Sequence, residues 1–298
     1  MHPDQLHPTA ETVEALVRTQ LPRLHGPVRP VHSAGTVNAL FRVGDHLVAR
    51  LPLRPIDLRA AVAALDAELA VAHRLLGAGL PVATPEPVAV GAPGHGYPMP
   101  WSLWRWLPGT TAADAGVRGS LAFASDLAEV VTALRALDTG GATHTGPGRG
   151  GRLADHEEAV RGYVAAAGDM ADPAALAALW DRLRRAGRAD DPDRWTHGDL
   201  MPGNLLTSAG RLTAVIDVGG TRPADPALDL MPAWNLLTAT ARAAFRAALG
   251  DDEPRWRRGG AWAYVQAIGC LAYYRETNPV MSATAARTLA ALAEDFPA

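Results

Sequence analysis

The chain has 298 residues, of which 48% are hydrophobic and 20% charged, which excludes a disordered polypeptide and leaves room for two ordinary domains. A net charge of −3 gives no general attraction to nucleic acid, so we expect no nucleic-acid partner. The single cysteine, Cys270, excludes an intramolecular disulfide, and no apolar run approaches the ~20 residues that span a bilayer. We therefore expect a cytoplasmic protein with no membrane partner.

The first third of the chain has the pattern of a small β-sheet with helices. Helices are indicated where apolar residues recur every three or four positions, and strands where β-branched and apolar residues form short runs. The dipeptide Gly44-Asp45 between two such runs predicts a hairpin turn. We expect helices over residues 9–20 and 57–76, and strands over residues 37–43, 46–51, 87–91 and 101–107.

After residue 109 the pattern becomes mostly helical. We expect helices over residues 120–137, within 153–188 (two, separated at Asp172-Pro173) and from about 226 to the end, with a short β-like stretch at 195–218 and a flexible glycine-rich loop at 140–151. A β-rich start followed by a helical remainder predicts an α+β fold with two lobes, residues 1–106 and residues 107–298.

The segment His197-Gly-Asp199-Leu-Met-Pro-Gly-Asn204 carries groups suited to phosphoryl transfer. That reaction needs a carboxylate for the nucleophile, oxygen ligands for Mg²⁺, and cationic or backbone donors for the phosphates. Asp199 is the candidate base, and Asn204 offers an amide oxygen. Asp217 follows an apolar run at 212–216 and precedes Val218-Gly219, a position that suits a second metal ligand.

With the downstream segment Asp225-Pro-Ala-Leu-Asp229, this spacing resembles the aminoglycoside phosphotransferase family. The resemblance implies a protein-kinase-like fold and transfer of the γ-phosphate of ATP or GTP to a hydroxyl of a small molecule. It implies that Asp199 is catalytic and that Asn204 and Asp217 bind Mg²⁺. It gives His197 and Asp229 structural roles, and it makes residues 1–106 the nucleotide-binding lobe and 107–298 the catalytic and substrate-binding lobe.

The chain has no Lys, so Arg must supply every cation that would hold phosphate groups. Relatives of this fold place a Lys on the third strand, paired with a Glu on the next helix; here Arg50 and Glu68 stand at those positions. Arg chelates phosphate bidentately, so we expect phosphate binding to be retained with altered geometry. A surface ion pair is the alternative. Gly35 and Thr36 lie where kinases place a phosphate-covering loop, although a plain β-turn fits equally well.

The segment from Trp101 to Gly109 corresponds to the hinge that holds the adenine in kinase-like folds. The resemblance favours the carbonyl of Arg105 and the N–H of Leu107 as the two backbone contacts, with Trp104 at the gatekeeper position. Core packing explains the tryptophans equally well.

The acceptor is the least determined feature. Residues 107–298 carry a net charge of −4, which suits a cationic aminoglycoside, and Asp155, Glu157 and Glu158 form an acidic group in the segment where the family builds its substrate pocket. A solvated helix face explains that group too. Other antibiotics, choline and sugars remain open, as does a nucleotide-binding pseudokinase. A protein kinase is disfavoured because no Ala-Pro-Glu follows Asp217.

Overall fold

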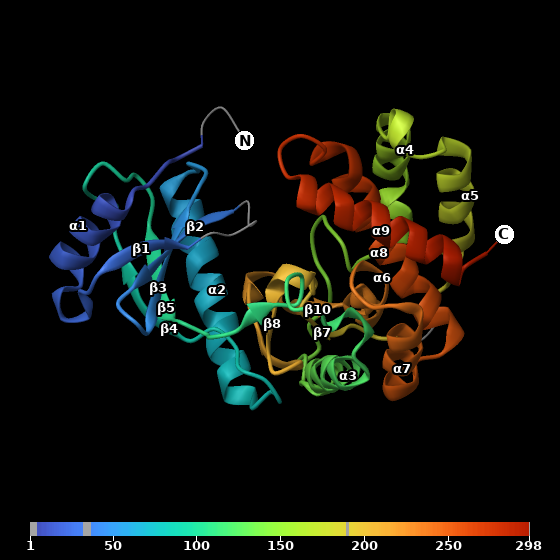
Figure 1. Ribbon diagram of the computed structural model, residues 1–298, viewed down its shortest axis with the longest axis horizontal. Helices are drawn as coiled ribbons and strands as arrows, with labels where there is room; N and C mark the ends of the chain where they lie inside the picture. The colour runs from blue at the N-terminus through green and yellow to red at the C-terminus, as the bar shows by residue number, and fades with distance from the viewer. Residues whose placement is uncertain (1–4, 32–36, 189–190, 298) are drawn as a thin grey trace. The chain divides into compact units, whose positions relative to one another are not determined.

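The computed structural model describes residues 5–31, 37–188 and 191–297 and divides the chain into two compact units (Figure 1). Unit 1 comprises residues 1–79 and 83–108, and unit 2 comprises residues 80–82 and 109–298. The fold is α+β, as predicted, with the larger sheet in unit 1 and most of the helices in unit 2.

Unit 1 is a five-stranded antiparallel sheet with the strand order β1-β2-β3-β5-β4 and two main helices. Its elements are α1 (Ala10–Gln20), β1 (Val28–Val31), β2 (Asn38–Val43), β3 (Leu47–Pro52), α2 (Leu58–Ala78), β4 (Pro87–Gly91) and β5 (Trp101–Arg105). The helix α2 runs two residues beyond the prediction, because the helix tolerates Gly77 and ends only where Gly79 adopts the left-handed conformation.

Alternation along the strands decides which side chains of unit 1 face its apolar core. Phe41 on β2 pairs with Ala49 on β3, and both are buried against α1. Because successive side chains point to opposite faces, Arg50 lies on the other face, where it pairs with Ser102 of β5. The sheet therefore places the charged side chain of Arg50 on the face opposite the apolar core.

Unit 2 contains two small sheets among helices. Its elements are β6 (Thr110–Thr111), α3 (Leu121–Ala136), α4 (Glu157–Ala166), α5 (Pro173–Leu183), β7 (Arg194–Thr196), β8 (Leu205–Ser208), β9 (Arg211–Val215), β10 (Arg222–Ala224), α6 (Pro232–Asn235), α7 (Ala239–Leu249), α8 (Glu253–Tyr273) and α9 (Pro279–Asp295). The strands pair in the orders β6-β8-β9 and β10-β7. Among the described helices, none combines the length and apolar character needed to cross a membrane.

Buried ion pairs fix the short 3₁₀ segment Pro226–Leu230 to α8. The carboxylate of Asp225 accepts hydrogen bonds from Arg258 Nε (3.0 Å), Trp262 Nε1 (2.9 Å) and the N–H of Ala227 (3.0 Å), and Asp225 is only 1% exposed. On the other side, Arg135 of α3 donates to the carbonyl of Pro226 at 2.8 Å. The segment that carries Asp229 is therefore held from two helices.

We predict that Asp225→Ala destabilises the protein by about 3–5 kcal/mol, because it leaves the buried guanidinium of Arg258 without its main partner. Urea denaturation followed by tryptophan fluorescence would measure the loss. The double variant Asp225→Ala/Arg258→Met should recover part of it, since removing both charges costs less than orphaning one. An unchanged free energy of unfolding in the single variant would contradict this account.

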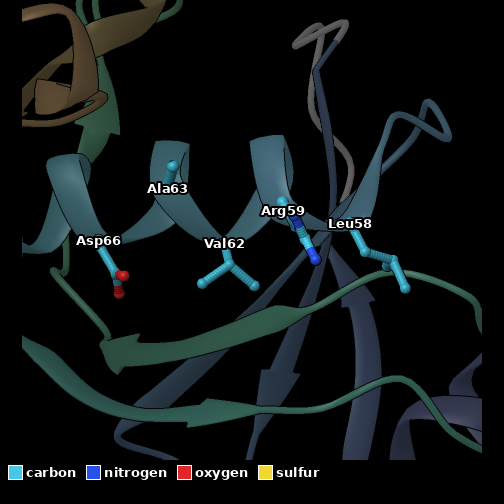
Figure 2. A pocket seen from close by; sticks show the side chains of 5 residues that line it. All are labelled: Leu58, Arg59, Val62, Ala63 and Asp66. Carbon is cyan, nitrogen blue, oxygen red and sulfur yellow. The ribbon is translucent and has the colours of Figure 1, made fainter.

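A shallow pocket on α2 contains none of the predicted site residues. Figure 2 shows its lining, which consists of Leu58, Arg59, Val62, Ala63 and Asp66 on neighbouring turns of that one helix. Leu58 and Val62 are about half exposed.

Candidate functional site

The backbone of the loop that carries Asp199 is held by a buried carboxylate. Asp229 accepts the N–H groups of His197 (2.7 Å, Oδ2) and Gly198 (2.8 Å, Oδ1). Burial raises the pKa of Asp229, against the opposing effects of His197 and the two N–H donors. Gly198 has φ of +79°, a conformation that other residues adopt only at a cost. Asp229 therefore positions the loop, as the family resemblance implied.

Both ring nitrogens of His197 are engaged in the same loop. Nδ1 accepts the N–H of Asp199 at 3.2 Å, and Nε2 lies 3.1 Å from the carbonyl of Ile216. Because a carbonyl only accepts, Nε2 carries a proton in this arrangement. These contacts join the loop to the segment just before Asp217 and leave His197 with a structural role.

Asn204 and Asp199 contact each other directly. Asn204 Nδ2 donates to the backbone carbonyl of Asp199 at 2.9 Å and to its Oδ2 at 3.2 Å. Since the amide nitrogen faces Asp199, the oxygen Oδ1 of Asn204 is the atom suited to bind a cation. The spacing of five residues thus brings the predicted base and the first predicted metal ligand together.

Asp217 lies beside Asn204 because of strand pairing. The N–H of Ile216 donates to the carbonyl of Asn204 at 2.9 Å, directly after the paired residues Leu205 and Val215. Asp217 itself is left-handed, with φ of +62° and ψ of +53°, a conformation in which Asp and Asn are the most tolerated side chains after Gly. The strand pairing therefore brings the backbone of Asp217 close to that of Asn204.

The donor set of Asn204 and Asp217 fits Mg²⁺. Proteins usually hold this ion in nucleotide sites through one or two oxygen ligands, with substrate phosphates and water completing the octahedron. Within the described residues, no group of three or more His, Cys, Asp and Glu side chains could hold a metal. These two side chains therefore suit a site in which Mg²⁺ binds two protein oxygens and the phosphates of a nucleotide.

Arg149 is a site residue that the sequence patterns did not indicate. Its Nη2 donates to Asp199 Oδ1 at 3.1 Å, and its Nη1 lies 3.0 Å from the sulfur of Met231. The glycine-rich segment that carries it is a loop, as predicted, and its end makes hydrogen bonds with other parts of unit 2. There the carbonyl of Arg149 accepts Arg222 Nη2 at 2.9 Å, and the carbonyl of Gly150 accepts the N–H of Asp225 at 2.8 Å.

Helix α8 adds a thiol and an amide to the surroundings of Asp199. Burial raises the pKa of Cys270, on which the charges of Arg149 and Asp199 also act in opposite directions. One turn earlier, Gln266 Nε2 lies 3.1 Å from the sulfur of Met201, two residues after Asp199 in the loop. These neighbours are distant in sequence, so only the packing of α8 reveals them.

In unit 1, Arg50 and Glu68 form the ion pair expected from their positions. Arg50 Nη1 contacts Glu68 Oε1, both side chains are less than one-fifth exposed, and the guanidinium lies 5.4 Å from the ring centroid of Trp104. The expected alternative, an exposed surface pair, does not describe this burial. Trp104 is itself buried and donates from Nε1 to Ser102 Oγ at 2.7 Å.

Two further predicted nucleotide contacts, Arg105 and Leu107, lie at and just after the end of β5. Arg105 is the last residue of β5, and its N–H donates to the carbonyl of Glu86 at 2.9 Å. Leu107 follows two residues later. Gly35 and Thr36 lie outside the described residues.

The acidic group on α4 is partly committed to structure. Glu157 accepts from Trp180 Nε1 at 2.9 Å and from Arg161 Nη2 at 3.1 Å, and these contacts, Trp180 first, lower its pKa. Its carboxylate therefore serves the packing of α4 against α5. Asp155 and Glu158 are exposed, as expected of a solvated face.

Sequence comparison agrees with this geometry. Residues 28–262 match the phosphotransferase enzyme family. The chain belongs to this family. The prediction of a phosphotransferase that acts on an alcohol group of a small molecule is thereby confirmed at the family level. No curated protein sequence matches the chain.

Solved structures of other family members share the fold across nearly the whole chain. The aminoglycoside phosphotransferase APH(2")-IIia, solved with GDP and kanamycin, is 20% identical with a TM-score of 0.72, and the match covers 95% of this chain and 98% of that one. APH(2")-IIa, solved with streptomycin and ATP, is 14% identical (TM-score 0.60; 95% and 99% covered). The macrolide 2'-phosphotransferase MphH of Brachybacterium faecium is 21% identical (0.60; 94% and 97%). Identities this low establish the fold and leave the acceptor undetermined.

Proposed function

We propose that the protein transfers the γ-phosphate of ATP or GTP to a hydroxyl group of a small molecule, with aminoglycoside and macrolide antibiotics as the first acceptors to test. The observation that carries the proposal is the arrangement in unit 2, where Asp199 and Asn204 lie on a loop held by His197 and Asp229 and strand pairing brings Asp217 close to Asn204. Because nucleoside triphosphates are available in the cytoplasm, we infer that the reaction takes place there.

Asp199 is assigned as the general base. The acceptor hydroxyl would give its proton to the Asp199 carboxylate while its oxygen bonds to the γ-phosphorus and the bond from phosphorus to the β-phosphate oxygen breaks. Each carboxylate oxygen can accept two hydrogen bonds, so the contacts with Arg149 and Asn204 leave capacity for the hydroxyl. The products are a phosphate ester and a nucleoside diphosphate.

Asn204 Oδ1 and the Asp217 carboxylate are assigned as the protein ligands of Mg²⁺, which when bound neutralises charge on the phosphates. In unit 1, Arg50 would bind the phosphates while its ion pair with Glu68 holds it in position. The backbone of Gly35 and Thr36, and the carbonyl of Arg105 with the N–H of Leu107, would complete the nucleotide site; the family resemblance supports these assignments.

We predict that Arg50→Lys raises KM for the nucleotide about tenfold, because Lys keeps the charge but loses the planar fork that binds two oxygens at once. Steady-state kinetics with ATP and GTP would measure the change. Arg54→Lys, an exposed Arg four residues along the chain, is the matched control. An unchanged KM in Arg50→Lys would show that the charge alone, and not the planar fork, matters for the nucleotide.

The direct test of the proposed function is a screen of aminoglycosides, macrolides, choline and sugars with Mg²⁺ and each nucleotide, read by the mass gain of one phosphate. Transfer to at least one acceptor is expected. Nucleotide binding without transfer across the panel would overturn the proposal and favour a pseudokinase.

A further inference from the structure

Two nitrogen donors near the loop that carries Asp199 face sulfur atoms instead of oxygen. Arg149 Nη1 lies 3.0 Å from Met231 Sδ, and Gln266 Nε2 lies 3.1 Å from Met201 Sδ. A thioether is a weak acceptor, so neither N–H group has a partner of its own strength in these contacts. Both would gain from a ligand that offers oxygen atoms.

Two positively charged side chains lie near the proposed base, Asp199. The guanidinium of Arg149 pairs with Asp199, and that of Arg222 donates to the carbonyl of Arg149. Burial lowers the pKa of Arg222, and the positive charge of Arg149 lowers it further. The two guanidinium groups are thus close enough to repel each other, and each also lies near a carboxylate, Arg149 near Asp199 and Arg222 near Asp229.

Several carboxylates of unit 2 are already engaged in contacts within the protein. Asp229 accepts two backbone N–H groups, and Asp225 accepts Arg258 and Trp262. Glu157 on α4 is engaged with Trp180. These three carboxylates are therefore committed to contacts within the protein.

Arg149 is fixed by its backbone as well as by its side chain. Gly150 has φ of +102°, and a Cβ added there would lie 2.7 Å from Ala224 Cβ, so the segment fits closely against β10. The side chain of Arg149 is only 24% exposed. Its position beside the base is therefore built into the fold and does not depend on a mobile side chain at the surface.

We propose, building on the proposed function, that the site around Asp199 selects acceptors whose groups near the reacting hydroxyl are hydrogen-bond acceptors (other hydroxyls, ring or carbonyl oxygens) over acceptors that carry ammonium groups there. Arg149 and Gln266 are the residues that determine this preference. A compound rich in oxygen satisfies both N–H groups, whereas a polyamine brings further donors and further positive charge.

The test compares kcat/KM for kanamycin and gentamicin, which carry several ammonium groups, with an uncharged trisaccharide, which is rich in oxygen and has no amine. The best oxygen-rich acceptor should exceed the best polycation by about tenfold or more. Arg149→Gln and Gln266→Glu should each reduce that ratio by about tenfold. A merely structural defect would lower activity toward both classes alike and leave the ratio unchanged.

Arg161→Gln is the matched control, because this Arg is 75% exposed and pairs only with Glu157 among the ion pairs of the described residues. A polycation as the best acceptor, or a ratio unaffected by both site variants, would overturn the inference. Calorimetric binding of the same compounds to Asp199→Asn distinguishes a failure of the selectivity from a failure of the proposed function. If no phosphate is transferred but the binding preference holds, the proposed function fails and the selectivity stands; binding of neither class overturns both.

Discussion

Asp199→Asn is expected to lower kcat for phosphoryl transfer by about 10²–10⁴-fold, the usual contribution of a general base, with little effect on nucleotide binding. The amide has almost the shape of the carboxylate, and its oxygen can still accept from Arg149 at the position of Oδ1. It cannot take the proton of the acceptor hydroxyl. Single-turnover transfer to the best acceptor of the screen, together with calorimetric binding of the nucleotide, would measure the two quantities separately.

Two observations would count against this assignment of the base. Transfer within tenfold of the parent enzyme would mean that the proton leaves by another route. An equal loss in nucleotide affinity would mean that the variant had disturbed the loop, where the new amide nitrogen faces Asn204 Nδ2 across 3.2 Å. Asp45→Asn, in the exposed turn between β2 and β3, controls for the chemical change itself.

The parts of the fold that could be predicted are those fixed by neighbours in the chain. The hairpin at Gly44-Asp45 and the paired strands β2 and β3 follow from a turn dipeptide between two apolar runs. The strand β1 was not among the predicted strands, because it has only four residues and contains Pro30, which suits an edge strand and weakens the pattern.

The catalytic loop was predictable for the same reason. Asp199 and Asn204 are five residues apart, and Asp217 follows a strand that pairs directly with the one after Asn204. The local sequence therefore contains nearly all the information that brings these three side chains together. Asp229 lies 32 residues from its partner His197, and only the family resemblance indicated its role.

Arg149 and Gln266 could not be found in this way. Their contacts join residues 50 and 65 positions apart, and neither lies in a motif. A glycine-rich segment has no periodicity, and it becomes ordered here because Asp225 and Arg222 bind its carbonyl groups. The same holds for the buried pairing of Arg258 with Asp225: a sequence rich in Arg does not show which of its charges are buried.

The second large effect is expected at Asp217, which follows the end of β9. Asp217→Asn should weaken Mg²⁺-dependent activity by about 10²–10³-fold, because the metal contributes several kcal/mol of charge stabilisation and an amide oxygen replaces a carboxylate. Asn is the informative substitution here because Asp217 is left-handed, with φ of +62°, and Asn tolerates that conformation better than Ala does. The loss can then be attributed to the charge and not to backbone strain.

Activity measured against Mg²⁺ concentration would distinguish metal binding from other causes. If Asp217 binds the metal, the variant should need a higher Mg²⁺ concentration for half-maximal activity, and part of the loss should be recovered at saturation. Asn204→Asp gives the complementary case: it adds a charge to the metal site but loses the Nδ2 donor that holds Asp199. We expect it to keep the Mg²⁺ requirement low while kcat falls, because orientation of the base is impaired and metal binding is not. Identical Mg²⁺ dependence in Asp217→Asn and the parent enzyme would show that the carboxylate of Asp217 does not bind the metal.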